Sequence, residues 1–376
     1  MAGWLDEGSS SSSSSISSSS SSKRRRRDCD CDCAESRRPR RKQHLYLALD
    51  DWDGGYSIHK LDADDILDDD FGGVRKLPEP AAIRIRWPVR GPMHFAALGT
   101  DIFFAAGPRF HGDDAPPATF VYETQAAALA VGPPLPTGLY SLGAAMAAGR
   151  KLYALTSPYH PEAPCLQALS WDLAARGDRA DWFWNAAPSS SPPPPCCGMD
   201  VVAHALHPDG RTLFVSTDSA THSLDTSDGA WRELGDWVLP FKGQAYFDAG
   251  LDAWVGIHRK GDGHVCCCPV ASRSAAAGRP PECRVLKGKL FLRNGEKTYQ
   301  NGGRHLKATL TCMGRGRFCL VENVLRVARM VGDSVLRVTL FSRKYDHMGE
   351  LRTKVRPRIR SYAVSKNNHM FSHAAF

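Results

Sequence analysis

Short apolar runs separated by turn residues make up most of the chain, and no stretch longer than about ten residues shows a helical period. Five of these runs lead into a glycine-centred turn and then into a second apolar run, with an aromatic side chain four residues after the glycine. The glycines are Gly99, Gly149, Gly210, Gly250 and Gly314, and the aromatics are Phe103, Tyr153, Phe214, Trp254 and Phe318. This pattern predicts five antiparallel hairpins whose aromatic side chains point inward. Their spacing of 50, 61, 40 and 64 residues is typical of propeller blades.

A second recurring element pairs an acidic residue with threonine. Glu123-Thr124 and Asp225-Thr226 are each followed, five residues after the threonine, by a large apolar side chain, Leu129 or Trp231, and both segments close on Leu-Pro. Short polar side chains cap turns by bonding to the backbone. We therefore expect a turn at each pair and an apolar side chain that packs against the neighbouring sheet.

Together the two elements predict an all-β fold, a six-bladed Kelch-like β-propeller. The expected blades span residues 44–90, 91–137, 138–196, 197–240, 241–303 and 304–364. Residues 354–364 read as a final strand that can pair with the first blade and close the ring, which removes exposed edges. Residues 324–340 predict two strands around a turn at Gly332-Asp333-Ser334.

The two ends of the chain differ from this body. Residues 1–43 contain a serine tract and then KRRRRDCDCDCAESRRPRRK, with almost no apolar side chains to offset the entropy of ordering. We therefore expect a disordered N-terminal tail, with order beginning at His44. Residues 365–376 are expected to form a flexible C-terminal tail.

The acidic-Thr pairs, the later tryptophan and the glycine-centred hairpins resemble Kelch-type β-propellers. The segments LYLALDDWDGGYSIHKLDADD, LPEP, FAALGTDIFFA and VYETQAAALAVGPPLP are more closely similar to the start of a large, grass-expanded plant family with a domain of unknown function. The resemblance covers roughly residues 44–364 and leaves out the tail. It implies the propeller fold and carries no activity or functional residue with it.

The net charge of +8 lies at the ends of the chain. Residues 1–43 carry a formal charge of +4 and residues 343–376 a charge of +6, whereas residues 44–342 sum to −2. A basic surface along the whole chain, as in proteins that bind long stretches of phosphate backbone, is therefore excluded.

Two basic clusters in the tail have the layout of a bipartite nuclear-import signal, with nine residues between them. Their residues are Lys23, Arg24, Arg25, Arg26 and Arg27, then Arg37, Arg38, Arg40, Arg41 and Lys42. We predict an import carrier as a partner and a nuclear or cytoplasmic location. The competing interpretation is a charged tail that only keeps the chain soluble.

A second basic feature lies in the expected last strand. Alternation in one extended strand would place five cations on one face, namely Arg352, Lys354, Arg356, Arg358 and Arg360. Such a stripe fits an acidic peptide or a nucleic-acid backbone, or else a solvated outer strand that discourages edge pairing. Pro357 favours an edge position.

Twelve cysteines are bunched in ways that make a disulfide framework a poor interpretation, and a reducing compartment is expected. Cys29, Cys31 and Cys33 have a CxC spacing that suits zinc less well than CxxC. His204 and His207 would face opposite sides of a strand, and Cys266–Cys268 read as partly buried in a strand. No secretory signal or apolar membrane span is recognisable. We predict no metal site and no cofactor.

Catalytic signatures such as GxSxG, the P-loop, GxGxxG and HExxH do not occur in the sequence. We therefore expect a non-catalytic scaffold that binds a protein partner through its loops or central funnel. One alternative is an enzyme or small-molecule binder that uses the funnel, which ionisable groups converging from several blades would support. A third is association with nucleic acid through the basic ends.

Overall fold

The computed structural model describes residues 43–52, 55–67, 73–86, 93–106, 119–136, 144–155, 166–173, 180–186, 201–260, 263–273, 279–290, 304–328, 331–364 and 373–376. All of them belong to one compact unit, Lys42–Phe376. Among these residues the regular structure is strand apart from one short helix, α1 (Ala63–Leu67), so the all-β prediction is confirmed. In the described ranges no helix has the length and apolar character needed to cross a membrane.

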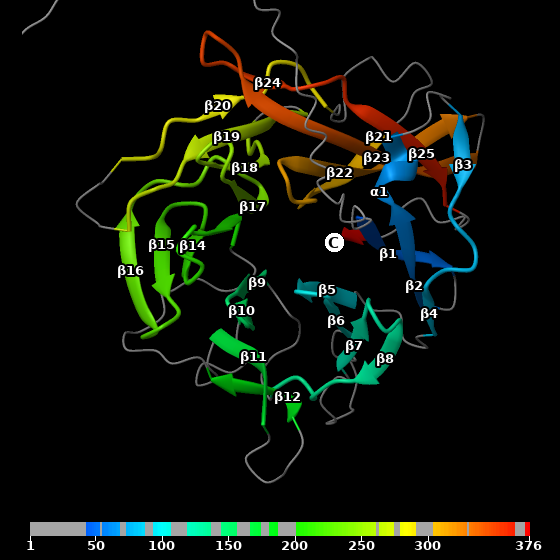
Figure 1. Ribbon diagram of the computed structural model, residues 1–376, viewed down its shortest axis with the longest axis horizontal. Coiled ribbons are helices and arrows are strands. Elements are labelled where there is room, and N and C mark those ends of the chain that lie inside the picture. The colour runs from blue at the N-terminus through cyan, green and yellow to red at the C-terminus, as the bar shows by residue number, and fades with distance from the viewer. Residues whose placement is uncertain are drawn as a thin grey trace, which may run out of the picture. The chain divides into compact units, whose positions relative to one another are not determined.

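Three sheets have four strands each (Figure 1). The first runs in the order β26 (His373–Ala375), β1 (His44–Trp52), β2 (Gly55–Asp62) and β4 (Ile83–Arg86). The second is β5 (Met93–Leu98), β6 (Asp101–Ala106), β7 (Thr119–Glu123) and β8 (Ala128–Val131). The third is β9 (Ala144–Ala148), β10 (Lys151–Leu155), β11 (Leu166–Leu173) and β12 (Ala180–Ala186).

The fourth sheet has eight strands and consists of two antiparallel halves. One half is β13 (Ala203–Leu206), β14 (Thr212–Ser216), β15 (Thr221–Asp225) and β16 (Ala230–Gly235). The other is β17 (Gly243–Asp248), β18 (Ala253–Ile257), β19 (Val265–Pro269) and β20 (Arg284–Val285). A parallel contact between β13 and β17, with Ala203 opposite Gly243, joins the halves.

The fifth sheet combines strands from distant parts of the sequence. Its order is β21 (Arg304–Cys312), β22 (Arg317–Ala328), β23 (Val331–Tyr345), β25 (Arg358–Ala363) and β3 (Val74–Lys76), with β24 (Leu351–Thr353) also paired to β23. Strands β22 and β23 confirm the hairpin expected at 324–340. The position of its turn was wrong, because Ala328 pairs with Val331 and Gly332 to Ser334 lie inside β23.

All five predicted glycine hairpins are present, as β5–β6, β9–β10, β13–β14, β17–β18 and β21–β22. Gly99 and Gly314 adopt φ angles of 61° and 72°, a left-handed conformation that glycine reaches without steric cost. The aromatic side chain four residues after each glycine is buried, with at most 3% of its surface exposed. The repeat in the sequence therefore marks both the turns and the core.

The second recurring element behaves differently in its two copies. Asp225 Oδ1 accepts a hydrogen bond from the Ser227 backbone N–H at 3.0 Å, and Trp231 packs against residues of β9 to β11 in the neighbouring sheet, as predicted. In the other copy Thr124 Oγ1 donates to the Thr100 carbonyl at 2.8 Å and helps close the turn. The packing prediction is wrong there, because 45% of Leu129 is exposed.

Apolar clusters join each group of strands to the next in chain order. Each of the six inter-group contacts is a cluster with members from both sides, for example Ile58 and Phe104, Phe103 and Leu169, Leu155 and Val215, Phe214 and Trp254, Val255 and Phe318, and Leu340 and Leu47. The last contact returns to the first sheet. The fold is therefore all-β and propeller-like, with its core between sheets that pack face to face.

Segments far apart in the chain pair at two places. β25 pairs in parallel with β3, which belongs to the first predicted blade, so the expected contact of residues 354–364 with that blade is present. The short strand β26 pairs with β1, with Ala374 opposite Ala48, and lies near the middle of the unit in Figure 1. Residues 373–375, expected within a flexible tail, thus form a strand because β1 offers them an open edge.

Candidate functional site

The largest described cavity lies among the strands nearest the middle of the unit and has a volume of about 1040 Å³. Residues from β5, β17, β21 and β26 contribute to its wall, together with Val201 and Val202 just before β13. Three of the lining residues carry a positive charge, namely Lys242, Arg259 and Lys307. Among the described residues that line the cavity, none is an aspartate or glutamate.

Hydrogen bonds hold the three cationic residues in place, two through the backbone and one through the side chain. Lys242 precedes β17 and its backbone N–H donates to the Ile257 carbonyl at 2.8 Å, which ties it to the end of β18. Arg259 follows β18, and its backbone N–H donates to Pro240 at 2.8 Å. Lys307 lies on β21, where its Nζ donates to the His373 carbonyl at 3.4 Å. Cations from separate strands therefore meet in one cavity.

The three cations differ in whether a carboxylate neutralises their charge. The guanidinium of Arg259 forms an ion pair with Asp218, whose side chain is 80% exposed at the surface. The side chain of Lys307 is exposed, yet its pKa is lowered, first by partial desolvation against the cavity wall and second by the positive charge of Lys242. Lys307 also helps to lower the pKa of His94, although burial contributes more. The two lysines repel each other, and a bound anion would relieve that repulsion.

Neutral polar groups beside the lysines can add hydrogen bonds. The amide of Gln244, the hydroxyl of Thr309 and the phenol of Tyr246 lie in the same lining. Burial raises the pKa of Tyr246 far above its ordinary value, so its phenol stays protonated and can donate. The cavity thus offers positive charge and neutral donors, which is the chemistry that recognises a carboxylate or phosphate.

A second hollow, of about 790 Å³, lies between the sheet β5–β8 and the sheet β9–β12. Its apolar surface includes Trp171, 45% exposed, and Val131, 77% exposed. The same lining holds three carboxylates, Asp101, Glu123 and Asp181, and one cation, Arg150. Asp101 lies opposite Glu123 in the β6–β7 ladder, and burial, followed by the charge of Glu123, raises the pKa of Asp101.

The basic clusters of the predicted import signal, Lys23–Arg27 and Arg37–Lys42, lie outside the described residues. The predicted stripe is described, and its premise of one extended strand is wrong. β24 and β25 are separate strands, and Pro357 between them has no N–H to continue the ladder. Arg352 pairs with Asp346 and Glu350, and Arg360 is only 7% exposed, so the five cations do not share one open face.

The histidines and cysteines considered in the sequence lie largely as expected. His207 Nδ1 contacts Asp209 at 3.2 Å in the turn between β13 and β14, whereas Nε2 of His204 is buried, and burial lowers the His204 pKa to about 4. Cys266, Cys267 and Cys268 are fully buried.

Sequence reasoning missed Lys242 and Lys307 as a pair and did not connect His258 with Cys266 and Cys283. These groups meet only through strand register and sheet packing.

The fold and cavity together define an all-β, propeller-like protein with a cationic central cavity. Residues 42–371 match the family DUF1668, described as a protein of unknown function, and the chain belongs to this family. A search of curated proteins gives no match. The resemblance to a plant family of Kelch-like proteins stays a prediction.

Several solved structures resemble the fold at low sequence identity. A Bacteroides uniformis protein described as a candidate 6-phosphogluconolactonase is 9% identical, with a TM-score of 0.42 over 88% of this chain and 100% of that one. A chain of a nidogen/laminin complex is 11% identical, with a TM-score of 0.38 over 86% and 99%. Apo AztD from Citrobacter koseri is 11% identical, with a TM-score of 0.35 over 89% and 98%.

Proposed function

We propose that the described unit is a six-bladed, Kelch-like β-propeller. The eight-stranded sheet consists of two four-stranded halves, β13–β16 and β17–β20, so the strands form six antiparallel groups. Each group packs on the next through an apolar cluster, as expected of neighbouring blades. The Asp225 turn and the packing of Trp231 support the Kelch-like description.

We further propose that this propeller is a non-catalytic binding module whose central cavity holds an anionic ligand. The observation that carries the proposal is that Lys242 and Lys307 face one cavity with no carboxylate among its described lining residues, and that Lys242 lowers the pKa of Lys307. A cavity of about 1040 Å³ accommodates a small organic anion or the acidic side chains of a partner segment. Charge-assisted hydrogen bonds from both lysines would supply affinity and orientation.

Thermal unfolding of the full chain tests this function. Phosphate and citrate are expected to raise the Tm above the value in chloride of equal ionic strength, because a ligand of the folded state stabilises it by mass action. These anions also stabilise proteins in general, so the decisive comparison is with Lys307→Met. The excess should disappear in Lys307→Met and persist in Lys344→Met, which changes an exposed lysine of β23 outside the cavity lining.

An equal rise in Tm for the wild type and Lys307→Met would contradict anion binding in the cavity. Chemical conversion of a bound anion would contradict the non-catalytic part of the proposal alone. The two outcomes are separable because one is read from unfolding and the other from the ligand recovered after incubation.

A second candidate function, protein binding, is favoured by the hollow between β5–β8 and β9–β12. The exposed Trp171 and Val131 lie beside Asp101, Glu123 and Asp181. This combination fits a basic peptide with an apolar anchor, because aromatic side chains dominate binding energy and opposite charges fix the register. A fluorescent peptide alternating lysine with leucine should bind the wild type and lose most of its affinity for Trp171→Ala. Undiminished binding to that variant would contradict the candidate.

For the N-terminal segment we propose recognition by a nuclear-import carrier through its two basic clusters, Lys23–Arg27 and Arg37–Lys42. Association of the basic ends with nucleic acid is the alternative. Removal of residues 1–43 should abolish nuclear accumulation of a fluorescent fusion, and an unchanged distribution would contradict the proposal. Binding to DNA or RNA that survives this deletion and neutralisation of Arg352 to Arg360 would exclude the alternative.

A further inference from the structure

Three side chains with metal-binding chemistry come from adjacent strands of the fourth sheet. Cys266 lies on β19, His258 follows β18 on one side, and Cys283 precedes β20 on the other. The ladder places Gly256 opposite Cys266 across β18–β19 and Val285 opposite it across β19–β20. His258 lies two residues beyond Gly256 and Cys283 two residues before Val285, so strand alternation brings both to the face that Cys266 occupies.

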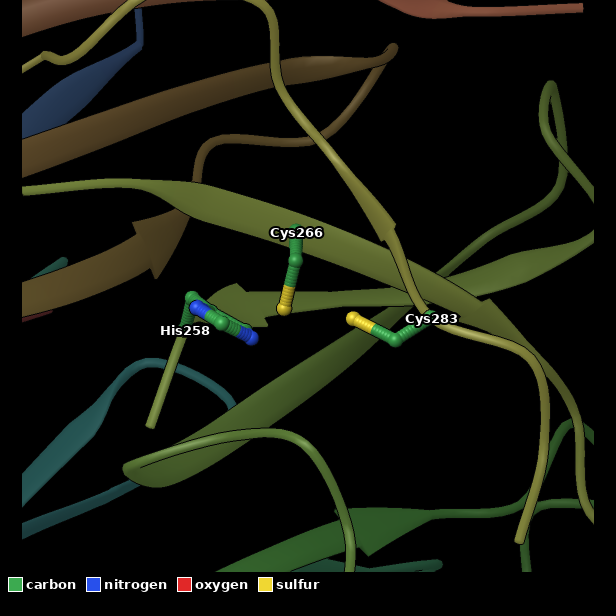
Figure 2. A group of neighbouring side chains, drawn as sticks. All are labelled: His258, Cys266 and Cys283. Carbon is green, nitrogen blue, oxygen red and sulfur yellow. The ribbon is translucent and has the colours of Figure 1, made fainter. Parts of the chain in front are cut away.

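Packing confirms which face this is. Cys266 belongs to the apolar cluster that contains Phe241 and Trp254, and Cys283 packs against the same cluster. Cys267 points the opposite way, where its Sγ is 3.3 Å from the Tyr345 hydroxyl. Figure 2 shows the two sulfur atoms and the imidazole of His258 directed toward one another.

The geometry of the three groups suits one metal ion. A nitrogen of His258 and the Sγ atoms of Cys266 and Cys283 all lie within 4.8 Å of one another. Cys266 is fully buried, whereas the other two are half-buried, so the group lies where the core meets the surface. Two thiolates and an imidazole are a ligand set that zinc favours, and tetrahedral coordination leaves a fourth position for water.

We propose that His258, Cys266 and Cys283 bind one zinc ion, with water as the fourth ligand. The ion would connect the end of β18, the middle of β19 and the beginning of β20. β20 has only two residues, so its place at the edge of the sheet depends on few backbone hydrogen bonds. A zinc ion bound there would therefore tie this short edge strand to its neighbours.

Zinc content of the full chain tests the proposal. Chain purified from zinc-supplemented cells and dialysed against metal-free buffer is expected to keep one zinc ion per molecule. Inductively coupled plasma mass spectrometry measures the zinc content. Cys283→Ala and Cys266→Ala should each lose it. Cys268→Ala is the matched control, because Cys268 is fully buried on the same strand and in the same apolar cluster but outside the group. The triple Ser variant of Cys29, Cys31 and Cys33 should also keep the ion.

Cobalt gives a second readout that does not depend on how well a buried variant folds. Wild-type chain loaded with Co²⁺ should show the thiolate-to-cobalt charge-transfer band of a tetrahedral site, and Cys283→Ala, which changes a half-buried residue, should weaken it. Zinc kept in full by Cys283→Ala, or no zinc in the wild type, would overturn the proposal. So would a Cys266–Cys283 disulfide in wild-type chain whose free thiols were blocked at lysis.

Discussion

Two regions of the molecule hold positive charge in contrasting surroundings, because Arg343 is buried whereas Lys242 and Lys307 are exposed at the wall of the central cavity. Arg343 on β23 forms an ion pair with Asp248 at the end of β17, and both residues are less than 10% exposed. The guanidinium also lies over the ring of Phe318 at 5.1 Å and donates to the Gly316 carbonyl at 3.0 Å. At the central cavity, by contrast, Lys307 faces Lys242, and the described lining residues provide no carboxylate.

The difference separates a cation that stabilises the fold from the two cations to which we assign a ligand. Taking a charge out of water is costly, and the protein offsets that cost at Arg343 with a carboxylate, a carbonyl and an aromatic face. Burial still lowers the pKa of Arg343 to about 10. At Lys307, desolvation and then the charge of Lys242 lower the pKa, and the described lining residues provide no carboxylate to offset either. An anion that binds between Lys242 and Lys307 would relieve the repulsion between them. We therefore attribute ligand binding to the cavity and fold stability to the Arg343–Asp248 ion pair.

The largest effect is expected from Asp248→Asn. The asparagine oxygen can still accept the hydrogen bond that Asp248 Oδ1 receives from the Gly250 N–H at 2.8 Å, so the turn survives and the charge is lost. Leaving Arg343 buried without its partner should lower the free energy of unfolding by about 3–5 kcal/mol, measured by urea denaturation. The double variant with Arg343→Met should be closer to wild type. A loss below about 1 kcal/mol would show that the Arg343–Asp248 ion pair contributes no more to the free energy of unfolding than a surface ion pair, and the contrast with the lysines would fail.

Lys307→Met sharpens the comparison from the other side. In ligand-free chain its free energy of unfolding should stay within about 0.5 kcal/mol of wild type, because no ion pair is lost and the repulsion by Lys242 is removed. The same urea experiment, run in chloride without polyvalent anions, gives the number. A loss as large as that of Asp248→Asn would show that Lys307 is a structural cation.

Lys242→Met should have an intermediate effect on binding. Removal of one of two charged donors is expected to weaken phosphate or citrate binding by about tenfold, near the value of one hydrogen bond to a charged group. The pKa of Lys307 should also rise toward its ordinary value, because the second cause of its lowering is gone. Calorimetric titration and NMR of the lysine side chains measure the two effects. Unchanged affinity would mean that Lys242 does not face the ligand.

The smallest effect concerns His94, whose pKa is lowered by burial and then by Lys307. NMR titration of the ring should show a higher His94 pKa in Lys307→Met. The unfolded chain takes up this proton at a higher pH than the folded chain, so stability falls as pH drops below about 6.5. That loss should be smaller in Lys307→Met than in Lys344→Met, and equal losses would show that the charge of Lys307 does not reach His94.

The hairpins could be predicted from the sequence because each depends on neighbouring residues. Gly314 permits the turn, alternation then carries Phe318 to the buried face, and both facts are local. The stripe from Arg352 to Arg360 failed because alternation was extended across Pro357, where the ladder breaks. The pairing of β26 with β1 joins residues more than 300 positions apart, and a three-residue strand leaves little apolar pattern to read.

The functional groups were harder to predict for the same reason. Lys242 lies just before β17 and Lys307 lies on β21 in another sheet, and nothing in their spacing indicates that they share a cavity. Cys283 lies seventeen residues after Cys266 and meets it only because β20 returns along β19. The alternation of apolar and polar residues within one strand can be predicted from the sequence. The register between strands cannot, because the packing of the whole unit sets it.

The most direct test of the cavity assignment is the dissociation constant for citrate, measured by isothermal titration calorimetry at neutral pH and constant ionic strength. Wild type and Lys344→Met should bind with equal affinity. Lys307→Met should bind at least about tenfold more weakly, because it lacks a charged donor in the cavity. Equal dissociation constants for all three proteins, or no heat of binding in the wild type, would contradict the assignment of the central cavity as an anion site.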